Sequence, residues 1–247
     1  MTAEHILALR QLWQDAFGDS DAFLDAFFAT GFSPDRCHFL LEEDTPVSAL
    51  YWFDCTLQGR KLAYLYAVAT AERHRGKGLA GRLLEETHNI LRSRGYSGAL
   101  LVPGAPGLFD FYRKLGYATV GKIAEFSCPA GDAPIPLRQI DAAEYAHLRK
   151  ELLPRGGVIQ ADTSLSFLES YCALYAGEDF LLAGECVDDN LIVQELLGNA
   201  AAAPGITRAL NCGNGNFRIP GAHRDFAMFL PLADNCPTPA YFGLALD

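Results

Sequence analysis

The stretch YLYAVATAERHRGKGLAGR, residues 64–82, carries the strongest structural signal in this chain. Its pattern predicts a buried strand, then a basic loop with spaced glycines, then an amphipathic helix. The loop cations are Arg73, His74, Arg75 and Lys77, and the glycines are Gly76, Gly78 and Gly81. Glycines let successive backbone N–H groups converge on an anion, and a helix N-terminus adds unpaired donors and a positive dipole end. The stretch therefore predicts a site for phosphate groups.

Two nucleotide-binding motifs do not fit the residues around this loop. Residues 76–81 match the dinucleotide fingerprint GxGxxG, which also needs an acidic residue about 20 positions further on to hold a ribose. Residues 100–103, Leu-Leu-Val-Pro, provide no acid. The GxxxxGK[ST] pattern of a nucleotide-hydrolysing P-loop is absent from the sequence. We therefore expect neither a nicotinamide-dependent oxidoreductase nor a nucleotide hydrolase.

The hexapeptide RHRGKG, residues 73–78, resembles the pyrophosphate-binding signature Q/R-x-x-G-x-G/A of the GNAT superfamily of N-acetyltransferases. Residues 107–117, GLFDFYRKLGY, are similar to that family's F-Y-x-x-x-G-[FY] segment. The predicted order of elements resembles the family too: two helices, three antiparallel strands, the signature, a long helix, a strand, a short helix and closing strands. The resemblance covers residues 1–127, about half of the chain.

The resemblance implies acetyl-CoA as the acyl donor and no metal. The backbone of residues 67–69 would pair with the pantetheine arm like an added strand, and the N–H groups around residues 75–80 would hold the pyrophosphate. The implied cofactor-binding residues are Ala67, Val68, Ala69, Arg73, His74, Arg75, Gly76, Lys77, Gly78, Leu79, Ala80 and Gly81. Tyr112 would lie near the thioester sulfur and act as the catalytic acid.

The general base stays open at this stage. Many family members place a glutamate on the signature strand, but residues 61–70 contain no acid. The alternatives are a water ordered by Tyr64 and Tyr66, Asp54 on the preceding strand, Glu125 on a closing strand, and the C-terminal carboxylate of Asp247. The last of these depends on YFGLALD, residues 241–247, forming an ordered strand.

The length of 247 residues allows one large domain or two small ones. CPAGDAPIP, residues 128–136, has three prolines and a glycine, which is typical of a boundary. We expect an α+β protein with a mixed sheet: a GNAT acyltransferase fold over 1–128, a linker over 129–136 and a smaller α+β domain over 137–247. A strand–turn–strand echo between residues 38–53 and 179–197 suggests a degenerate GNAT-like repeat, resembling the partner domain of tandem acetyltransferases that shapes the acceptor pocket.

The formal charge of −10 is unevenly placed, with a net −2 in residues 1–127 and a net −8 in residues 128–247. An acidic chain is a poor partner for nucleic acid or an anionic membrane, since both attract clustered Lys and Arg. Residues 199–205, where a second phosphate loop would lie, lack cations. The acidity of this half is compatible with a cationic acceptor, such as a polyamine, an aminoglycoside or a basic peptide, and equally with a role in solubility alone.

The seven cysteines are scattered and form no CxxC pair, so neither a disulfide framework nor a zinc site is indicated. They are expected as buried small residues in a reducing cytoplasm. The N-terminus MTAEHILALRQ lacks the basic start and apolar core of a signal peptide. The longest apolar run, near residues 62–69, is far below the ~20 residues of a membrane span. The expected location is cytoplasmic, and a homo-oligomer is compatible with the sequence.

The function that these features favour is an N-acetyltransferase. It would move an acetyl group from acetyl-CoA to a primary amine of a small or peptidic, cationic acceptor by direct attack. The alternative is a non-catalytic acyl-CoA-binding sensor or scaffold, which the missing strand glutamate supports.

Overall fold

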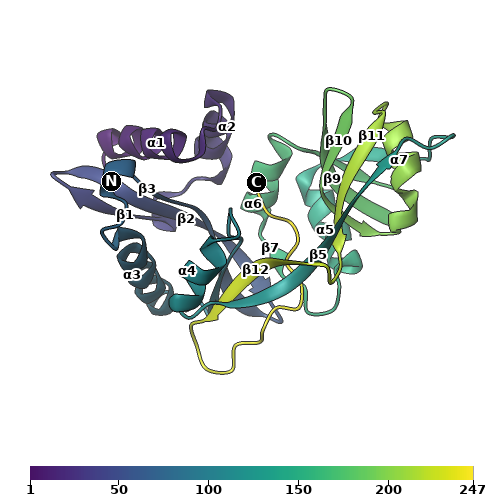
Figure 1. Ribbon diagram of the computed structural model, residues 1–247. Helices are drawn as coiled ribbons and strands as arrows, with labels where there is room; N and C mark the ends of the chain where they lie inside the picture. The colour runs from purple at the N-terminus through teal and green to yellow at the C-terminus, as the bar shows by residue number, and fades with distance from the viewer. Residues whose placement is uncertain (247) are drawn as a thin grey trace.

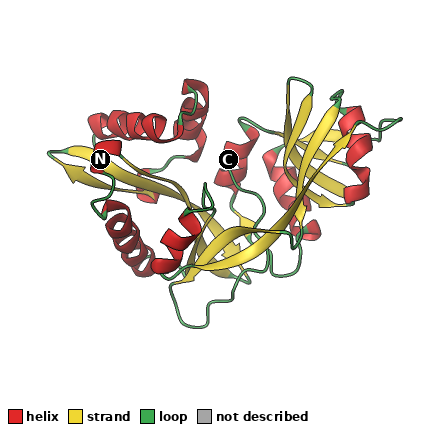
Figure 2. Ribbon diagram, in the orientation of Figure 1, coloured by secondary structure: helices red, strands yellow, loops and turns green. Residues whose placement is uncertain are grey.

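One mixed sheet of twelve strands runs through the protein in the computed structural model, which describes residues 1–246 (Figure 1, Figure 2). The strands are β1 Cys37–Glu42, β2 Thr45–Leu57, β3 Arg60–Thr70, β4 Gly98–Leu101, β5 Ala118–Pro129, β6 Arg138–Ile140, β7 Ile159–Gln160, β8 Ala173–Ala176, β9 Phe180–Val187, β10 Asn190–Gly198, β11 Asn214–Pro220 and β12 Arg224–Pro231. The helices are α1 Ala3–Phe17, α2 Asp21–Ala26, α3 Leu79–Ser93, α4 Leu108–Lys114, α5 Ala142–Leu152, α6 Asp162–Glu169 and α7 Ala203–Ala209. The predicted α+β class with a mixed sheet is confirmed.

The strand order is β1-β2-β3-β4-β12-β5-β11-β10-β9-β8-β6, and β7 pairs with β2. Helices α1 and α2 lie on one face of the first strands, and α3 and α4 lie on the other (Figure 1). In the second half, α7 covers one face of the sheet while α5 and α6 pack on the opposite face. None of the helices among residues 1–246 combines the length and the apolar character needed to cross a bilayer.

Helix ends follow local sequence chemistry. Ser20 caps α2, because its hydroxyl accepts a hydrogen bond from the Phe23 N–H at 3.2 Å. Helix α3 buries Leu83, Leu84 and Leu91 along one stripe. The chain leaves α3 through Gly95, whose φ of 76° is in the left-handed region that glycine adopts at little cost.

The same parallel crossover occurs twice in the sheet. β3 pairs with β4 in parallel over residues 62–64 and 98–100, and α3 connects them. β10 pairs with β11 in parallel over residues 190–193 and 214–217, and α7 connects them. The hairpin β9–β10 is thus equivalent in topology to β2–β3, whereas the sequence echo had aligned it with β1–β2, one strand too early. The structure supports a repeated unit but corrects its register.

The C-terminal part of the chain completes the sheet of the N-terminal part. β12 lies between β4 and β5, antiparallel to both. β5 in turn continues past its pairing with β12 to pair with β11 of the second half, so the sheet is continuous between the two halves (Figure 1). The division into 1–128, 129–136 and 137–247 therefore stays a prediction, to which the structure adds that β12 lies within the first unit.

An aromatic cluster joins the two halves on the α2 side of the sheet. Phe167 of α6 contacts Phe27 and Phe53 of the first half, with ring centroids 5.3 and 6.1 Å apart. Tyr171, just after α6, contacts Phe23 of α2 at 5.0 Å. Aromatic pairs at these separations add about 0.5–1.5 kcal/mol each beyond the burial of their surface, so this contact fixes α6 against the first half.

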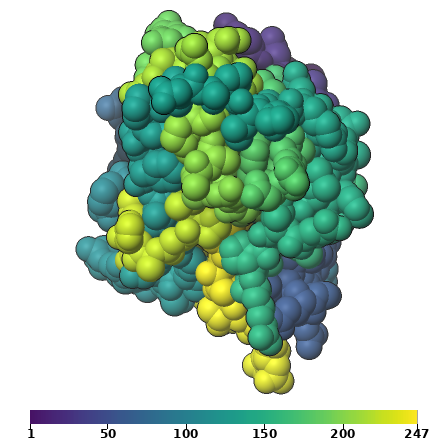
Figure 3. Space-filling model, turned by 90° about the vertical axis from the view of Figure 1, so that its right-hand side faces the viewer, coloured from purple at the N-terminus to yellow at the C-terminus, as the bar shows by residue number. Residues whose placement is uncertain are grey.

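Residues 241–246 were expected to form a strand, and the structure corrects this. They are buried, but apart from a single bridge between Tyr241 and Gly157 they have no strand partner. The Val158 N–H donates to the Tyr241 carbonyl at 3.0 Å, and side chains bind the backbone further on: Gln160 Nε2 donates to the Leu244 carbonyl at 3.1 Å, and the Tyr66 hydroxyl donates to the Leu246 carbonyl at 2.5 Å. In Figure 3, which faces the second half, yellow residues near the C-terminal end of the chain are visible below it, with green residues between them and the blue residues of the first half.

The cysteine prediction is also corrected at one pair. Cys186 of β9 and Cys212, which follows α7, form a disulfide. The 26-residue separation of the two cysteines resembles no motif. The pairing instead arises because β9 lies beside β10 and α7 returns the chain to the same edge region. The other five cysteines are free.

A buried ion pair ties the second half to the C-terminal segment. Arg149 of α5 donates to both carboxylate oxygens of Glu195 of β10, at 2.6 and 2.9 Å, and both side chains are almost fully buried. The Tyr241 hydroxyl donates to the same carboxylate at 2.9 Å. Burial alone would lower the pKa of Arg149, but the Glu195 carboxylate outweighs it and the net pKa is raised, so Arg149 remains charged.

We predict that Glu195→Gln lowers the free energy of unfolding by about 3–5 kcal/mol, because it leaves the Arg149 charge buried without a counter-charge. Urea denaturation measures this as a lower midpoint. The control is Glu144→Gln, which breaks an exposed pair with Arg138 and is expected to leave the midpoint nearly unchanged. Equal effects of the two variants would contradict the assignment.

Candidate active site

A break in the pairing between β3 and β4 creates the site. Ala49 and Tyr51 of β2 pair with Ala69 and Tyr66 of β3, so two residues of β3 stand opposite one of β2, as in a β-bulge. Ala67 adopts a φ of 49° there, in the left-handed region that is strained for a residue with a Cβ. The β3–β4 pairing ends at Tyr64. The backbone of residues 67–69 consequently lies beyond the reach of β4.

A cavity of about 490 Å³ occupies the space where the two strands diverge. Tyr64, Leu65, Tyr66, Ala67 and Val68 of β3 line one wall, and residues 101–104 line the opposite wall. The remaining lining residues are Trp13, Phe17, Asp19, Phe23, Leu108, Tyr112, Arg224, Phe226, Ala245 and Leu246. The structure thus brings Ala67, Val68 and Tyr112 together around one cavity, whose lining also includes residues of the C-terminal segment.

The glycine-spaced loop ends at the N-terminus of α3. Gly76 and Gly78 have φ angles of 76° and 77°, and nothing lies within 4 Å of where a Cβ would stand. The first helical hydrogen bond runs from the Arg82 N–H to the Gly78 carbonyl. Within the described chain, the N–H groups of residues 76–81 have no acceptor. This part of the loop, which includes Leu79, Ala80 and Gly81, therefore offers a cluster of open donors to an anion.

The cationic side chains of the loop lie in three different environments. Lys77 is exposed on the loop. His74 is buried, receives a hydrogen bond from Arg73 Nε at 3.0 Å and lies 3.3 Å from the Glu42 carboxylate. Its imidazole is thus turned into the protein, which leaves only its backbone for a ligand. Arg73 and Arg75 line a different hollow, of about 850 Å³, between the loop and α1.

Tyr112 is positioned by the short helix α4. Its side chain is 6% exposed and packs in the core with Tyr117, at a ring separation of 5.7 Å. No described residue makes a hydrogen bond to the Tyr112 hydroxyl, although the side chain lines the cavity. Burial raises the pKa of Tyr112 to about 12. The hydroxyl therefore keeps its proton at neutral pH and can donate it to a ligand in the cavity.

The structure shows which of the candidate bases line the cavity. Tyr64 and Tyr66 line the cavity, as the pattern of alternate residues on one strand face requires. Asp54 is not among the cavity residues and accepts a hydrogen bond from the Tyr96 hydroxyl at 2.5 Å. Glu125 accepts one from Arg224 at 2.5 Å. Asp247 lies outside the described residues.

Asp19 is a cavity residue that the sequence analysis missed. It stands in Asp19-Ser20-Asp21, residue types that favour a helix N-cap; Ser20 caps α2, but Asp19 does not. The Asp19 carboxylate instead accepts a hydrogen bond from Trp13 Nε1 at 2.7 Å. The sequence did contain a signal for this role: Ser20 is sufficient to cap α2, so the acidic residue before it is not needed as a cap.

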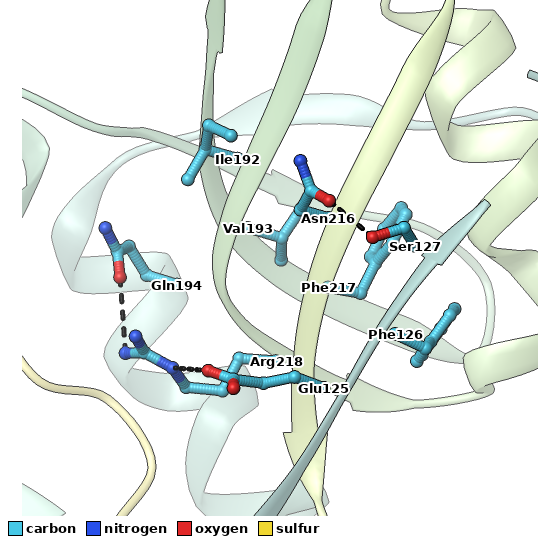
Figure 4. A pocket seen from close by; sticks show the side chains of 9 residues that line it. All are labelled: Glu125, Phe126, Ser127, Ile192, Val193, Gln194, Asn216, Phe217 and Arg218. Atoms are coloured by element: carbon cyan, nitrogen blue, oxygen red, sulfur yellow. Dashed lines mark hydrogen bonds and ion pairs between the residues drawn. The ribbon is translucent and has the colours of Figure 1, made fainter. Parts of the chain in front are cut away.

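A second hollow, of about 520 Å³, lies on the sheet of the second half (Figure 4). It is lined from β5, β10 and β11 by residues that include Glu125, Gln194 and Arg218. Arg218 donates to the Gln194 side chain at 3.2 Å and its Nε is 3.6 Å from Glu125. Glu125 also pairs with Arg224, which lines the first cavity. Within residues 1–246 no group of three or more His, Cys, Asp or Glu side chains could hold a metal ion.

Comparison with known proteins gives a match to the same region of the chain. Residues 1–120 match the family model of the acetyltransferase (GNAT) domain. No curated protein sequence matches the chain significantly.

Solved structures resemble the whole chain. A GCN5-related N-acetyltransferase from Anabaena variabilis has a TM-score of 0.73 at 16% identity, over 94% of this chain and 71% of that one. One from Kribbella flavida has 0.70 at 18%, over 93% and 69%. A tandem GNAT protein from the clavulanic acid biosynthesis pathway has 0.57 at 10%, over 94% and 96%. Identities this low establish the fold alone.

We predict that Gly78→Ala weakens binding of CoA at least tenfold, since the φ of 77° strains any residue with a Cβ and the loop must move its N–H donors. Isothermal titration calorimetry measures the affinity. The matched control is Gly95→Ala, which has a φ of 76° and the same open surroundings at the other end of α3. The control is expected to lose similar stability and to bind CoA normally; weakened binding in both variants would count against the loop.

Proposed function

We propose that this protein, whose residues 1–120 match the family model of the GNAT acetyltransferase domain, transfers an acetyl group from acetyl-CoA to a primary amine. The observation that carries the proposal is the single cavity shared by the bulge of β3 and the Tyr112 side chain. The loop that follows β3 has open backbone donors for a phosphate, and the cavity beside β3 has a protonated hydroxyl. Acetyl-CoA has groups that complement both features: a pyrophosphate for the backbone donors and a thioester for the hydroxyl.

The donor would be held largely by backbone. The N–H groups of residues 76–81 would bind the pyrophosphate, helped by the positive end of the α3 dipole and by the exposed Lys77. The free backbone edge of residues 67–69 would pair with the amides of the pantetheine arm, as an added strand does. This arrangement would bring the thioester to the cavity, beside Ala67 and Tyr112.

The proposed reaction is one direct displacement. The neutral amine nitrogen forms a bond to the thioester carbonyl carbon, and the carbon–sulfur bond breaks. The nitrogen loses one proton and the sulfur gains one, so the products are an acetamide and the free thiol of CoA. A backbone N–H at the β3 bulge would stabilise the developing oxyanion.

Tyr112 would act on the leaving sulfur. A thiol has an ordinary pKa of about 8.5, well below the value of about 12 to which burial raises the pKa of Tyr112. Its hydroxyl would therefore donate a hydrogen bond as negative charge develops on sulfur, with proton transfer following bond cleavage. The proton leaving the amine would balance the one that the thiolate takes up.

The amine must be neutral when it attacks, and a base that neutralises it has to face the cavity. Of the candidates weighed from sequence, only Tyr64 and Tyr66 line it among the described residues. We favour a water held by these two hydroxyls, whose other contacts include the backbone of Leu246. Asp54 and Glu125 are engaged by Tyr96 and Arg224, which supports structural roles for both.

A non-catalytic acyl-CoA-binding sensor or scaffold is the competing function. Both functions require acetyl-CoA binding, but only the enzyme releases thiol. Incubation with acetyl-CoA and a panel of primary amines, followed by titration of free CoA, separates them. Release that depends on the amine supports the transferase, whereas micromolar binding with no release for any amine supports the sensor.

We predict that Tyr112→Phe lowers kcat at least tenfold while the affinity for acetyl-CoA changes little, because only the hydroxyl that serves the leaving group is lost. Steady-state thiol release and calorimetry provide the two numbers. Tyr117→Phe is the matched control: it removes a neighbouring hydroxyl that bonds His88 at 2.7 Å and does not line the cavity. An unchanged kcat in Tyr112→Phe would exclude the proposed role.

A further inference from the structure

We infer that the acceptor is a monoamine with a flat, apolar body, and that Asp19 binds its ammonium group on entry, before the nitrogen loses a proton to the water held by Tyr64 and Tyr66 and attacks. This rests on the proposed function and names the substrate class of the same cavity. Three features support it: an aromatic wall that reaches the surface, a carboxylate with an open oxygen in that wall, and the lack of further acidic side chains among the described lining residues.

The wall on the α1 and α2 side of the cavity is aromatic. The rings of Phe17, Phe23 and Tyr66 lie with their centroids 6.0, 6.5 and 5.4 Å from that of Trp13. Phe17 remains 49% exposed, and Leu108 on α4 remains 40% exposed. Large apolar side chains that are left exposed at the rim of a cavity indicate an apolar ligand surface that covers them.

Asp19 gives this wall its charge. Trp13 Nε1 holds one carboxylate oxygen of Asp19 at 2.7 Å, which fixes the side chain. Within the described chain, the other oxygen has no hydrogen-bond donor and the carboxylate has no cationic partner. An ammonium group at this oxygen would form a charge-assisted hydrogen bond, and the neighbouring aromatic rings would stabilise the cation further.

The other charged group of the lining is already neutralised. Arg224 pairs with Glu125 at 2.5 Å, and its guanidinium lies over the Phe226 ring at 5.4 Å. None of the described acidic residues of the second half lines the cavity. The net charge of −8 in that half is therefore not placed to bind an acceptor in this cavity. One carboxylate suits a monoamine, whereas a polyamine or an aminoglycoside would bring several uncompensated charges into an aromatic site.

The test compares 2-phenylethylamine, spermidine and tobramycin as acceptors in the thiol-release assay with acetyl-CoA. We expect kcat/KM for 2-phenylethylamine to exceed that for either polycation at least tenfold. In Asp19→Asn, which keeps the shape and an oxygen for Trp13 Nε1, KM for 2-phenylethylamine should rise at least tenfold while kcat stays within about twofold. The matched control is Asp25→Asn, an exposed acid that pairs with Arg10 on the surface of α2, with both constants unchanged.

Binding without turnover keeps this inference separate from the proposed function. If no amine releases thiol, the proposed function fails, and 2-phenylethylamine is titrated into the CoA-loaded Trp52→Phe variant, in which Trp13 is the one remaining tryptophan, while tryptophan fluorescence is followed. Saturable quenching that Asp19→Asn weakens at least tenfold supports the amine site. Absence of quenching, equal binding by Asp19→Asn, or a preference for spermidine or tobramycin overturns it.

Discussion

The site depends on the point at which two parallel strands cease to pair. β3 and β4 share hydrogen bonds over residues 62–64 and 98–100, and the bulge at Ala67 then turns β3 away. Unpaired backbone in a protein interior is costly unless something satisfies it. The cavity, the open edge of residues 67–69 and the access of Tyr112 to a ligand all follow from this divergence. The strain at Ala67 persists because β2 and the helices on both faces hold the strand in place.

The two halves use one topological unit for different purposes. β3–α3–β4 carries the glycine-spaced basic loop, whereas residues 199–205 between β10 and α7 are alanine-rich and lack cations. The second half instead contributes to the walls of the first site. Arg224 and Phe226 come from β12, and Ala245 and Leu246 come from the segment that Tyr241 and the Arg149–Glu195 pair hold in place. The C-terminal part of the chain thus supplies part of the cavity wall.

What the sequence predicted well is what short-range patterns encode. The loop glycines and the amphipathic α3 depend on neighbours within a turn or two, so the strand, loop and helix of residues 64–82 could be predicted directly. The misses involve partners far apart in the chain. Cys186 meets Cys212 only because the sheet folds. Residues 241–246 contact side chains of distant elements, such as Gln160 and Tyr66. Asp19 becomes a cavity residue only because β3 and residues 101–104 form the other walls.

The position of β12 has a consequence for how the protein is made. As a ribosome synthesises the chain from its N-terminus, β4 and β5 emerge more than 90 residues before the strand that must lie between them. Until β12 arrives, both strands present unpaired backbone edges that can pair with other chains. The N-terminal half therefore completes its sheet last although it is encoded first, and a chain that stops before residue 224 would leave the facing edges of β4 and β5 unpaired.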